Sequence, residues 1–193
     1  MAESEGREPG HEAKLVRDAQ AGRSAAFAEL LRRYAPRVSA LVYQLTSDAD
    51  AARDLSQTVF LKAYRGIRSL RSGASLRAWL FQIAANEAKS FLRRRQRERE
   101  HLPPDAQPLA EAAAADRGPL DRLVADEERA AVRAALDELP PRQRSVLVLR
   151  HFHGLSTAEA AEALKCSANA VKANLCYALK SLRAKLAGGE NRE

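Results

Sequence analysis

Two closely spaced helix starts near the C-terminus constrain the fold of this chain more than any other feature. Ser156 is a good N-cap, and Glu159 three residues later completes a capping box before an alanine-rich run. Ser167 is a second N-cap. It precedes apolar residues at helical spacing: Val171, Leu175, Ala178, Leu182 and Leu186. The pattern predicts a helix, a tight turn and a second helix.

Two prolines mark the start of this C-terminal unit. Pro140 and Pro141 fit the first turn of a helix but not its interior. They therefore separate a helix that ends near Leu139 from a predicted helix over residues 142–152, which Gly154 ends.

The last helix has a face suited to DNA. Opposite its apolar side lie small, amide and basic residues: Asn169, Ala170, Ala173, Tyr177 and Lys180, with Lys172 and Asn174 on the flanks. No Asp or Glu occurs from Lys165 to Gly189. Such a helix fits the major groove, where its N-terminal residues reach base edges and its cations meet phosphates. The alternative is a solvated basic helix in an ordinary bundle.

This C-terminal stretch resembles a known family. The residues ALDELPPRQRSVLVLRHFHGLSTAEAAEAL, followed by a helix that contains Val171-Lys172, resemble region 4 of the extracytoplasmic-function (ECF) group of sigma-70 factors. The LPPRQR turn and the GLS entry to the next helix are the most specific parts. Regulators of the LuxR type share the helix-turn-helix, so this third of the chain leaves both families open.

Composition points to a helical protein with a polyanionic partner. The chain has 193 residues, enough for one large domain or two small ones, and a net charge of +7. Aromatic residues are only 5%, and Ala, Leu, Arg and Glu dominate, which favours helix. No apolar run approaches the roughly 20 residues that span a bilayer, and residues 1–10 are unlike a signal peptide. We expect a cytoplasmic protein without membrane insertion.

The N-terminal half also has helical periodicity. We expect helices over residues 11–21 and 25–45, the second with Ser24 as its cap and Pro36 in its interior, and a third over residues 49–64. On the third helix bulky and polar residues lie off the apolar stripe: Asp54, Gln57, Phe60, Leu61 and Tyr64. They indicate an exposed protein-docking surface. The alternative is that Phe60 packs in a second seam.

A fourth helix, capped by Ser75, has a second stripe away from its apolar side. The stripe consists of Trp79, Gln82, Asn86, Lys89 and Arg93. An indole, two amides and two cations match what a single nucleic-acid strand requires: a stacking surface, donors for base edges and charge for the backbone. The alternative is that Trp79 is a core residue. The basic cluster Arg93-Arg94-Arg95 and Arg97 favours the nucleic-acid interpretation.

This half resembles the same family, in the same order. The segments FAELLRRYAPRV, DLSQTVFLKAYRGI and LRAWLFQIAANEAKSFLRRR resemble regions 2.1 to 2.4 of the ECF sigma factors. The two resemblances together cover the chain from about Leu15 to Leu186 and disfavour the LuxR type.

The resemblance implies an all-α fold of two small helical domains, a region 2 bundle and a region 4 helix-turn-helix, joined by a flexible linker. The expected divisions are a disordered N-terminus (1–10), region 2 (11–96), a proline-containing linker (97–126), region 4 (127–187) and a tail (188–193). Extended, such a linker reaches about 100 Å. Two promoter elements about 20 base pairs apart lie roughly 70 Å from each other.

The resemblance also implies partners and sites. Region 2 would bind core RNA polymerase through Asp54, Gln57, Phe60, Lys62 and Tyr64. It would open the −10 element of promoter DNA with Arg71, Arg77, Trp79, Gln82, Asn86, Lys89 and Arg93. Region 4 would read the −35 element with Ser167, Asn169, Lys172, Asn174, Tyr177 and Lys180. An anti-sigma factor is a further expected partner, and no cofactor or metal is expected.

Four positions depart from the family pattern. Lys165 stands where Gly is common in the region 4 turn, so the turn either differs or carries strain of about 1 kcal/mol. Asn174 and Tyr177 stand where Arg is frequent, and Ser90 where an acidic residue is. We therefore expect an altered or weaker −35 preference.

Other functions have less support. The chain has no Gly-rich phosphate loop and no convincing nucleophile and base, so we expect no enzyme. The set His151, His153, Cys166 and Cys176 is spread over separate helices, and the two Cys would lie roughly 15 Å apart, too far for a shared metal or a disulfide. The remaining alternative is a helix-turn-helix regulator that binds duplex DNA without polymerase.

Overall fold

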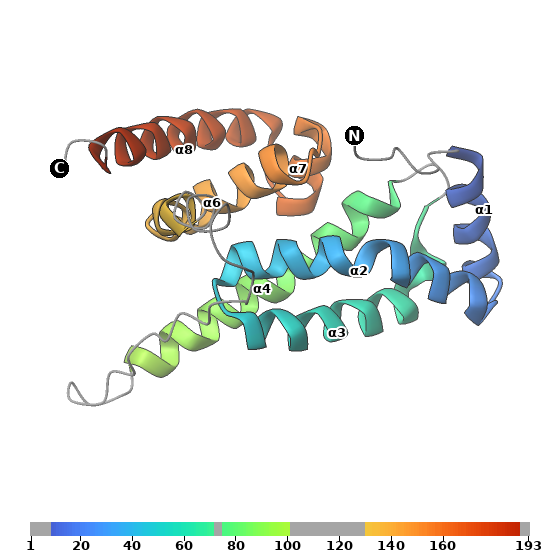
Figure 1. Cartoon of the computed structure of the whole chain (residues 1–193). Coiled ribbons are helices and arrows are strands. Elements are labelled where there is room, and N and C mark those ends of the chain that lie inside the picture. The colour runs from blue at the N-terminus through green and yellow to red at the C-terminus, as the bar shows by residue number, and fades with distance from the viewer. Residues whose placement is uncertain (1–8, 72–74, 101–129, 190–193) are drawn as a thin grey trace, which may run out of the picture.

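A computed structural model describes residues 9–71, 75–100 and 130–189, and the described residues form helices without any strand. The helices of the N-terminal half are α1 (Pro9–Gln20), α2 (Ser24–Thr46), α3 (Ala49–Gly66), the short 3-10 helix η1 (Ile67–Ser69) and α4 (Leu76–Glu100). In the C-terminal half, residues 130–137 are helical and are followed by α6 (Pro141–Leu147), the π-helical turn η2 (Val148–Phe152), α7 (Thr157–Leu164) and α8 (Ala168–Gly189). Figure 1 shows this order. The prediction of an all-α fold is confirmed.

Side-chain caps define several of the helix starts. Ser156 and Glu159 form the predicted capping box, with each side chain bound to the other residue's backbone N–H at 3.1 and 2.7 Å. Ser167 accepts a hydrogen bond from the Ala170 N–H at 3.1 Å, as predicted for a cap. The cap predicted at Ser24 is wrong, because α2 begins one residue earlier: Arg23 is its N-cap and gives no side-chain hydrogen bond.

The N-terminal half is a bundle whose core lies between α2, α3 and α4. Its fully buried side chains include Val38, Leu41, Val59 and Phe81. Pro36 lies inside α2, and the helix continues through it from Ser24 to Thr46 as one element, as predicted. The apolar stripes of the sequence therefore face inward here.

The C-terminal half is a second, smaller helical unit. Residues 130–137, α6 and α8 share an apolar cluster made by Leu136, Leu139, Leu147 and Ala178. A Glu138–Lys185 ion pair joins the same elements on the surface. The turn between α7 and α8 places Lys165 in the left-handed backbone region, with φ 51° and ψ 52°. Of the two expectations for this turn, a different turn or a strained one, the structure contains the strained turn.

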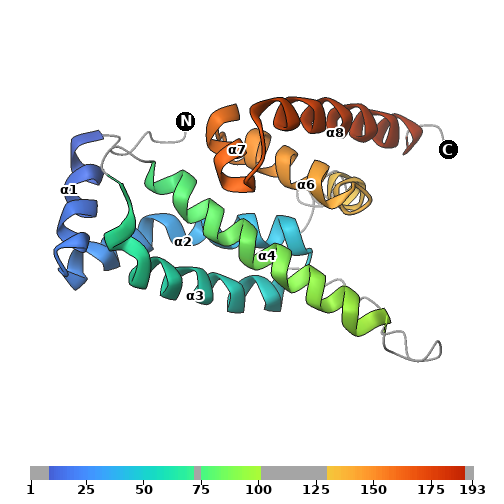
Figure 2. The same ribbon diagram turned by 180° about the vertical axis from the view of Figure 1, so that it is seen from behind.

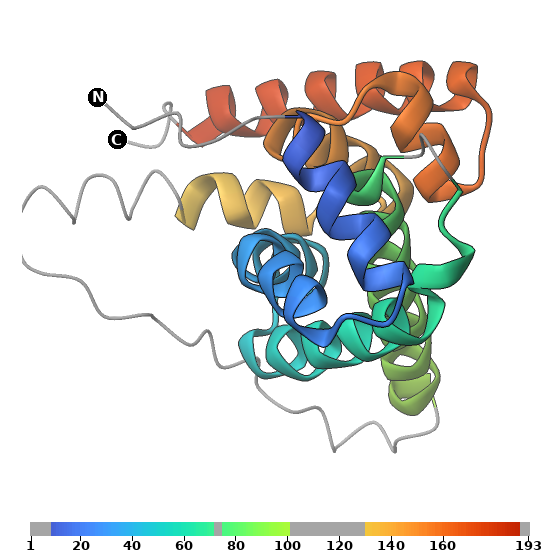
Figure 3. The ribbon, with the colours of Figure 1, turned by 90° about the vertical axis from the view of Figure 1, so that its right-hand side faces the viewer.

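The two halves pack against each other. Figures 1 and 2 show α6, α7 and α8 as a layer above α2 and α4, and in Figure 3 α8 crosses the side of the molecule opposite α3. One apolar cluster combines Leu80 and Phe81 of α4 with Leu155 and Ala160 of the C-terminal half. The sequence predicted the two units but not this contact.

The predicted boundaries fall partly outside the described residues. Helix α4 continues to Glu100, four residues into the predicted 97–126 linker, while residues 101–126 lie outside the described part of the chain. Pro9 and Gly10, expected in the disordered N-terminus, belong to α1, and Gly188 and Gly189, expected in the tail, belong to α8. Within the described ranges, no helix is long and apolar enough to cross a membrane.

Candidate nucleic-acid interface

Helix α4 positions six of the seven residues predicted to handle the −10 strand. Arg71 follows η1 and the others lie on α4. Arg71, Lys89 and Arg93 are exposed, whereas the other four residues are partly buried: Arg77, Trp79, Gln82 and Asn86. The stripe thus has an open, cationic end at the C-terminal part of α4 and a partly covered end near its start.

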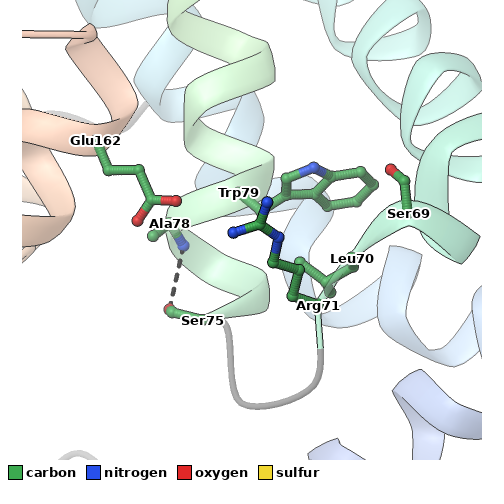
Figure 4. Close-up of a pocket in the computed structure, with 7 residues that line it drawn as sticks. All are labelled: Ser69, Leu70, Arg71, Ser75, Ala78, Trp79 and Glu162. Atoms are coloured by element: carbon green, nitrogen blue, oxygen red, sulfur yellow. Dashed lines mark hydrogen bonds between the residues drawn. The ribbon is translucent and has the colours of Figure 1, made fainter.

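Trp79 lies in a small pocket at the covered end of the stripe. The pocket has a volume of about 170 Å³, and Figure 4 shows its lining residues: Ser69, Leu70, Arg71, Ser75, Ala78, Trp79 and Glu162. A Cβ at position 66 would lie 3.3 Å from Cζ2 of the indole, so a larger residue than Gly66 would require the ring to shift by a few tenths of an ångström. Trp79 also packs against the apolar core. The two interpretations of this residue are therefore compatible: the indole is partly core and partly pocket wall.

Two residues of the predicted −10 surface, Arg77 and Gln82, contact the C-terminal half. The Arg77 guanidinium lies 3.5 Å from the Glu159 carboxylate and donates to the Gly154 carbonyl at 3.4 Å. The Gln82 amide donates to the backbone carbonyl of Glu162 at 3.3 Å. Part of the predicted −10 surface is therefore occupied by α7 and the loop before it.

The residues of α3 that are predicted to contact polymerase include both exposed and buried side chains. Asp54, Gln57, Lys62 and Tyr64 are exposed, and Lys62 pairs with Glu87 of α4 at 2.6 Å. Phe60 is only 9% exposed and belongs to the core, so the second packing seam considered for it is present.

The exposed apolar residues on α3 are instead Leu61 and Tyr64, at 58% and 55% exposure. The Tyr64 ring also makes an edge contact with Phe27 of α2, with ring centroids 5.0 Å apart. The sequence pattern had grouped Leu61 with the off-stripe residues of α3.

Helix α8 presents most of the predicted −35 residues to solvent. Val171 and Ala178 are buried, while five of the six predicted residues are exposed: Ser167, Asn169, Lys172, Tyr177 and Lys180. Asn174 is partly buried, and its amide donates to the Ala170 carbonyl at 2.7 Å. That amide is thus engaged with the helix backbone.

The four residues considered for a metal or disulfide site, His151, His153, Cys166 and Cys176, do not form one. Across the described ranges, no group of three or more His, Cys, Asp and Glu side chains could hold a metal ion. Cys166 and Cys176 are both free thiols. His153 lies instead between the halves, with Nε2 2.8 Å from Oε1 of Gln44.

Sequence reasoning missed Glu162 as a member of the Trp79 pocket. It is separated from Arg71 and Trp79 by the whole central part of the chain, and no local pattern links them. Ser75 was identified as a cap, and its hydroxyl does accept from the Ala78 N–H at 3.2 Å, but its place in the pocket depends on the fold.

Both halves match known protein families. Residues 30–98 match Sigma-70 region 2, and residues 129–182 match Sigma-70, region 4. The chain is 32% identical over 178 residues to the RNA polymerase sigma-H factor of Pseudomonas aeruginosa, covering 88% of this chain and 90% of that protein. It is 31% identical over 181 residues to the ECF RNA polymerase sigma-E factor of Haemophilus influenzae, covering 89% of this chain and 93% of the relative.

A solved structure has the same arrangement of elements. The sigma factor RpoE of Bartonella quintana, crystallised with the anti-sigma factor NepR, matches with a TM-score of 0.69 and 30% identity, over 83% of this chain and 96% of that one. With matches in both halves and over nearly the full length of these relatives, this chain belongs to the ECF group of the sigma-70 family of RNA polymerase sigma factors.

Proposed function

We propose that this chain binds core RNA polymerase and directs promoter-specific transcription initiation as a sigma factor. The observation that carries the proposal is the presence, in one chain, of a tryptophan pocket beside a cationic helix and of a capped, acid-free helix in a helix-turn-helix. The first suits a single strand and the second suits a duplex groove. A protein that starts transcription requires both kinds of contact. It acts by binding rather than as an enzyme, in the cytoplasm.

The α4 stripe is the proposed −10 surface. Opening DNA costs about 1.4 kcal/mol of stacking per base-pair step on average, and a captured unstacked base offsets part of that cost. The Trp79 pocket supplies the aromatic wall, and exposed cations such as Lys89 and Arg93 supply charge for the backbone. Arg71, Arg77, Gln82 and Asn86 complete the set.

The exposed face of α8 is the proposed −35 surface. Ser167 caps this helix, and Asn169 and Lys172 lie in its first turns, where a helix in the major groove meets base edges. Tyr177 and Lys180 lie further along. The Asn174 amide is engaged with the Ala170 carbonyl, which supports an altered −35 preference relative to relatives with Arg at this position.

The proposed polymerase surface is the exposed side of α3. Asp54, Gln57, Lys62 and Tyr64 are available for contact. Phe60 supports this surface from within by packing in the core. The boundaries proposed for the two functional units stay at residues 11–96 and 127–187, with the linker between them.

An anti-sigma factor is the proposed regulator. The related factor of Bartonella quintana was solved in complex with one. We propose a partner of the same class for this chain, which would hold the factor away from polymerase until a signal releases it.

The test is transcription by bacterial core RNA polymerase on a promoter library, with and without the purified chain. We expect promoter-specific transcripts only when the chain is added. Trp79→Ala should reduce strand opening, detected by permanganate reactivity of unpaired thymines, and Trp79→Phe should retain most of it because a ring remains in the pocket. Lys180→Ala should weaken duplex binding uniformly and lower its salt dependence by about one phosphate contact.

A plain helix-turn-helix regulator gives different results in the same experiment. It would bind a promoter duplex tightly without polymerase and would produce no transcripts that depend on the chain. That outcome would overturn the sigma assignment. The region 2 match and the exposed side of α3 favour the sigma factor, because a simple regulator has no use for them.

A further inference from the structure

We propose that Gln20, at the C-terminal end of α1, is a positioning residue for the Trp79 pocket. Its side-chain amide fixes the pocket wall formed by Ser69, Leu70 and Arg71, and this wall determines how selectively the pocket accepts a −10 base. The inference rests on the proposed function and deepens it, since the −10 base is the ligand concerned. Figures 1 and 2 show α1 beside the segment that joins α3 to α4, which carries this wall.

Gln20 makes two hydrogen bonds to this segment. Its Nε2 donates to the Ile67 carbonyl at 3.1 Å and to the Leu70 carbonyl at 2.8 Å. A side-chain amide has two N–H donors, so one glutamine holds both carbonyls at once. These bonds join residues that are 47 and 50 positions apart in the chain. The position of the wall therefore depends on an element that is distant in sequence.

The wall needs such a support because its own secondary structure is short. Helix η1 has three residues, and the Leu70 N–H closes it by donating to the Ile67 carbonyl at 3.1 Å. A 3-10 turn has poorer hydrogen-bond geometry than an α-helix, and carbonyls at a helix end lack partners within the helix. The side chains of Ser69 and Arg71 are exposed and line the pocket. Gln20 thus holds the backbone from which both of these side chains extend.

Helix α1 is itself held in place at both ends. Near its start, the hydroxyl of the buried Tyr34 on α2 donates to the Glu12 carboxylate at 2.8 Å. After its end, Gly22 has φ 88° and brings the chain so close to η1 that a Cβ there would lie 3.7 Å from Nη2 of Arg68. A donor on such a support holds the wall in one place and does not follow its movement.

Loss of the two hydrogen bonds should change selectivity more than binding. The indole of Trp79 would remain, and stacking on an aromatic ring tolerates different bases. Discrimination between bases requires polar groups at fixed positions, because the wrong base leaves such groups unpaired. The polar side chains beside the indole include those of Ser69 and Arg71 (Figure 4). A wall that moves can adjust to several bases, so the preference for one base falls.

The test compares one promoter from the library with the same promoter carrying a single −10 base change. For each protein, the measured quantity is the ratio of the two initiation rates with core polymerase. Gln20→Met keeps a flexible side chain of similar length but has no donor. We expect it to lower the ratio about threefold or more, as suits the loss of hydrogen bonds at a recognition site. Because both rates come from one protein, a smaller folded fraction cancels from the ratio.

Trp79 provides a second readout, because it is the only tryptophan in the chain. In the free protein, acrylamide quenching of its fluorescence should increase in Gln20→Met, since a displaced wall uncovers the indole. Gln44→Met is the matched control. The Gln44 side chain also has a hydrogen-bond partner, Nε2 of His153 at 2.8 Å, but it does not line the Trp79 pocket. This control should change neither the ratio nor the quenching.

Gln20→Asn keeps the test valid if the methionine variant does not fold. Asparagine retains the amide but is one methylene shorter, so it can bond the two carbonyls only after the wall moves toward it. The ratio should therefore fall in this variant too, by less than in Gln20→Met.

The outcomes separate this inference from the proposed function. An unchanged ratio in both variants of Gln20, or an equal fall in Gln44→Met, would overturn the positioning role while the sigma assignment stands. A lower ratio without a change in quenching would place the effect outside the pocket wall and overturn the role as well. If no transcripts depend on the unmodified chain, the proposed function is overturned, and the inference with it.

Discussion

Lys165 is a non-glycine residue in a left-handed turn, and its substitution tests how much strain the helix-turn-helix carries. At φ 51° its Cβ is crowded, which costs about 1–2 kcal/mol, while glycine there would lose about 0.5–1 kcal/mol through the greater freedom of the unfolded chain. We expect Lys165→Gly to raise the free energy of unfolding by about 0.5 kcal/mol in urea denaturation. Lys172→Gly, within α8, should lower it by about 1 kcal/mol. A loss of equal size in both variants would contradict the strained turn.

His153 makes the free energy of unfolding of this protein depend on pH. Burial, with smaller contributions from the Arg37 and Arg77 charges, lowers the pKa of His153 from 6.5 to about 4. Below pH 6.5 the unfolded chain therefore binds a proton that the folded chain does not, so stability is full above that pH and falls as the pH drops toward 4.

We expect a loss of at most about 2 kcal/mol between pH 7.5 and pH 5, measured by urea denaturation at each pH. His153→Gln should remove most of this difference, since glutamine does not titrate. His151→Gln changes an exposed ring and should preserve it. A pH dependence that is the same in all three proteins would show that His153 is not protected from protonation.

Helix α3 illustrates how adjacent residues on one element serve different purposes. Phe60 faces the core and Leu61 faces solvent. We expect Phe60→Ala to lower the free energy of unfolding by about 3–5 kcal/mol because it leaves a cavity. Leu61→Ala should change stability by less than about 0.5 kcal/mol but weaken binding to core polymerase about tenfold, as loss of an exposed apolar anchor does.

Urea denaturation and competition for core polymerase against a labelled sigma factor separate the two effects. Unchanged polymerase affinity in Leu61→Ala would place the docking surface elsewhere than on this side of α3. A stable Phe60→Ala protein would contradict the buried position of its ring.

At the scale of the whole molecule, the shared apolar cluster should hold the halves together without a covalent connection. A protease site introduced between residues 104 and 120 would allow the chain to be cut after folding. Since Phe81, Leu155 and Ala160 remain buried in one cluster, we expect the two fragments to elute together on gel filtration at about 10 µM. Separate elution of the fragments would contradict a stable contact between the two halves. The uncut protein provides the reference elution volume.

Residues that are neighbours in the chain were enough to predict the local features of this protein. The 3.6-residue periodicity, the caps at Ser156 and Ser167, and the prolines at 140 and 141 are read from neighbours in the chain, so the helices and the outward face of α8 could be predicted. The family followed from the same segments, and both family matches confirm it.

The directions in which ambiguous residues face, and the elements that cover them, depend on how distant segments pack together. Phe60 could face solvent in a docking surface or pack in a second seam, and the packing of α2 and α4 against α3 placed it inside. The contact of Arg77 and Gln82 with α7 joins residues about eighty positions apart. Local periodicity cannot encode such a pairing, because it depends on how two separately amphipathic units bury their remaining apolar surface against each other.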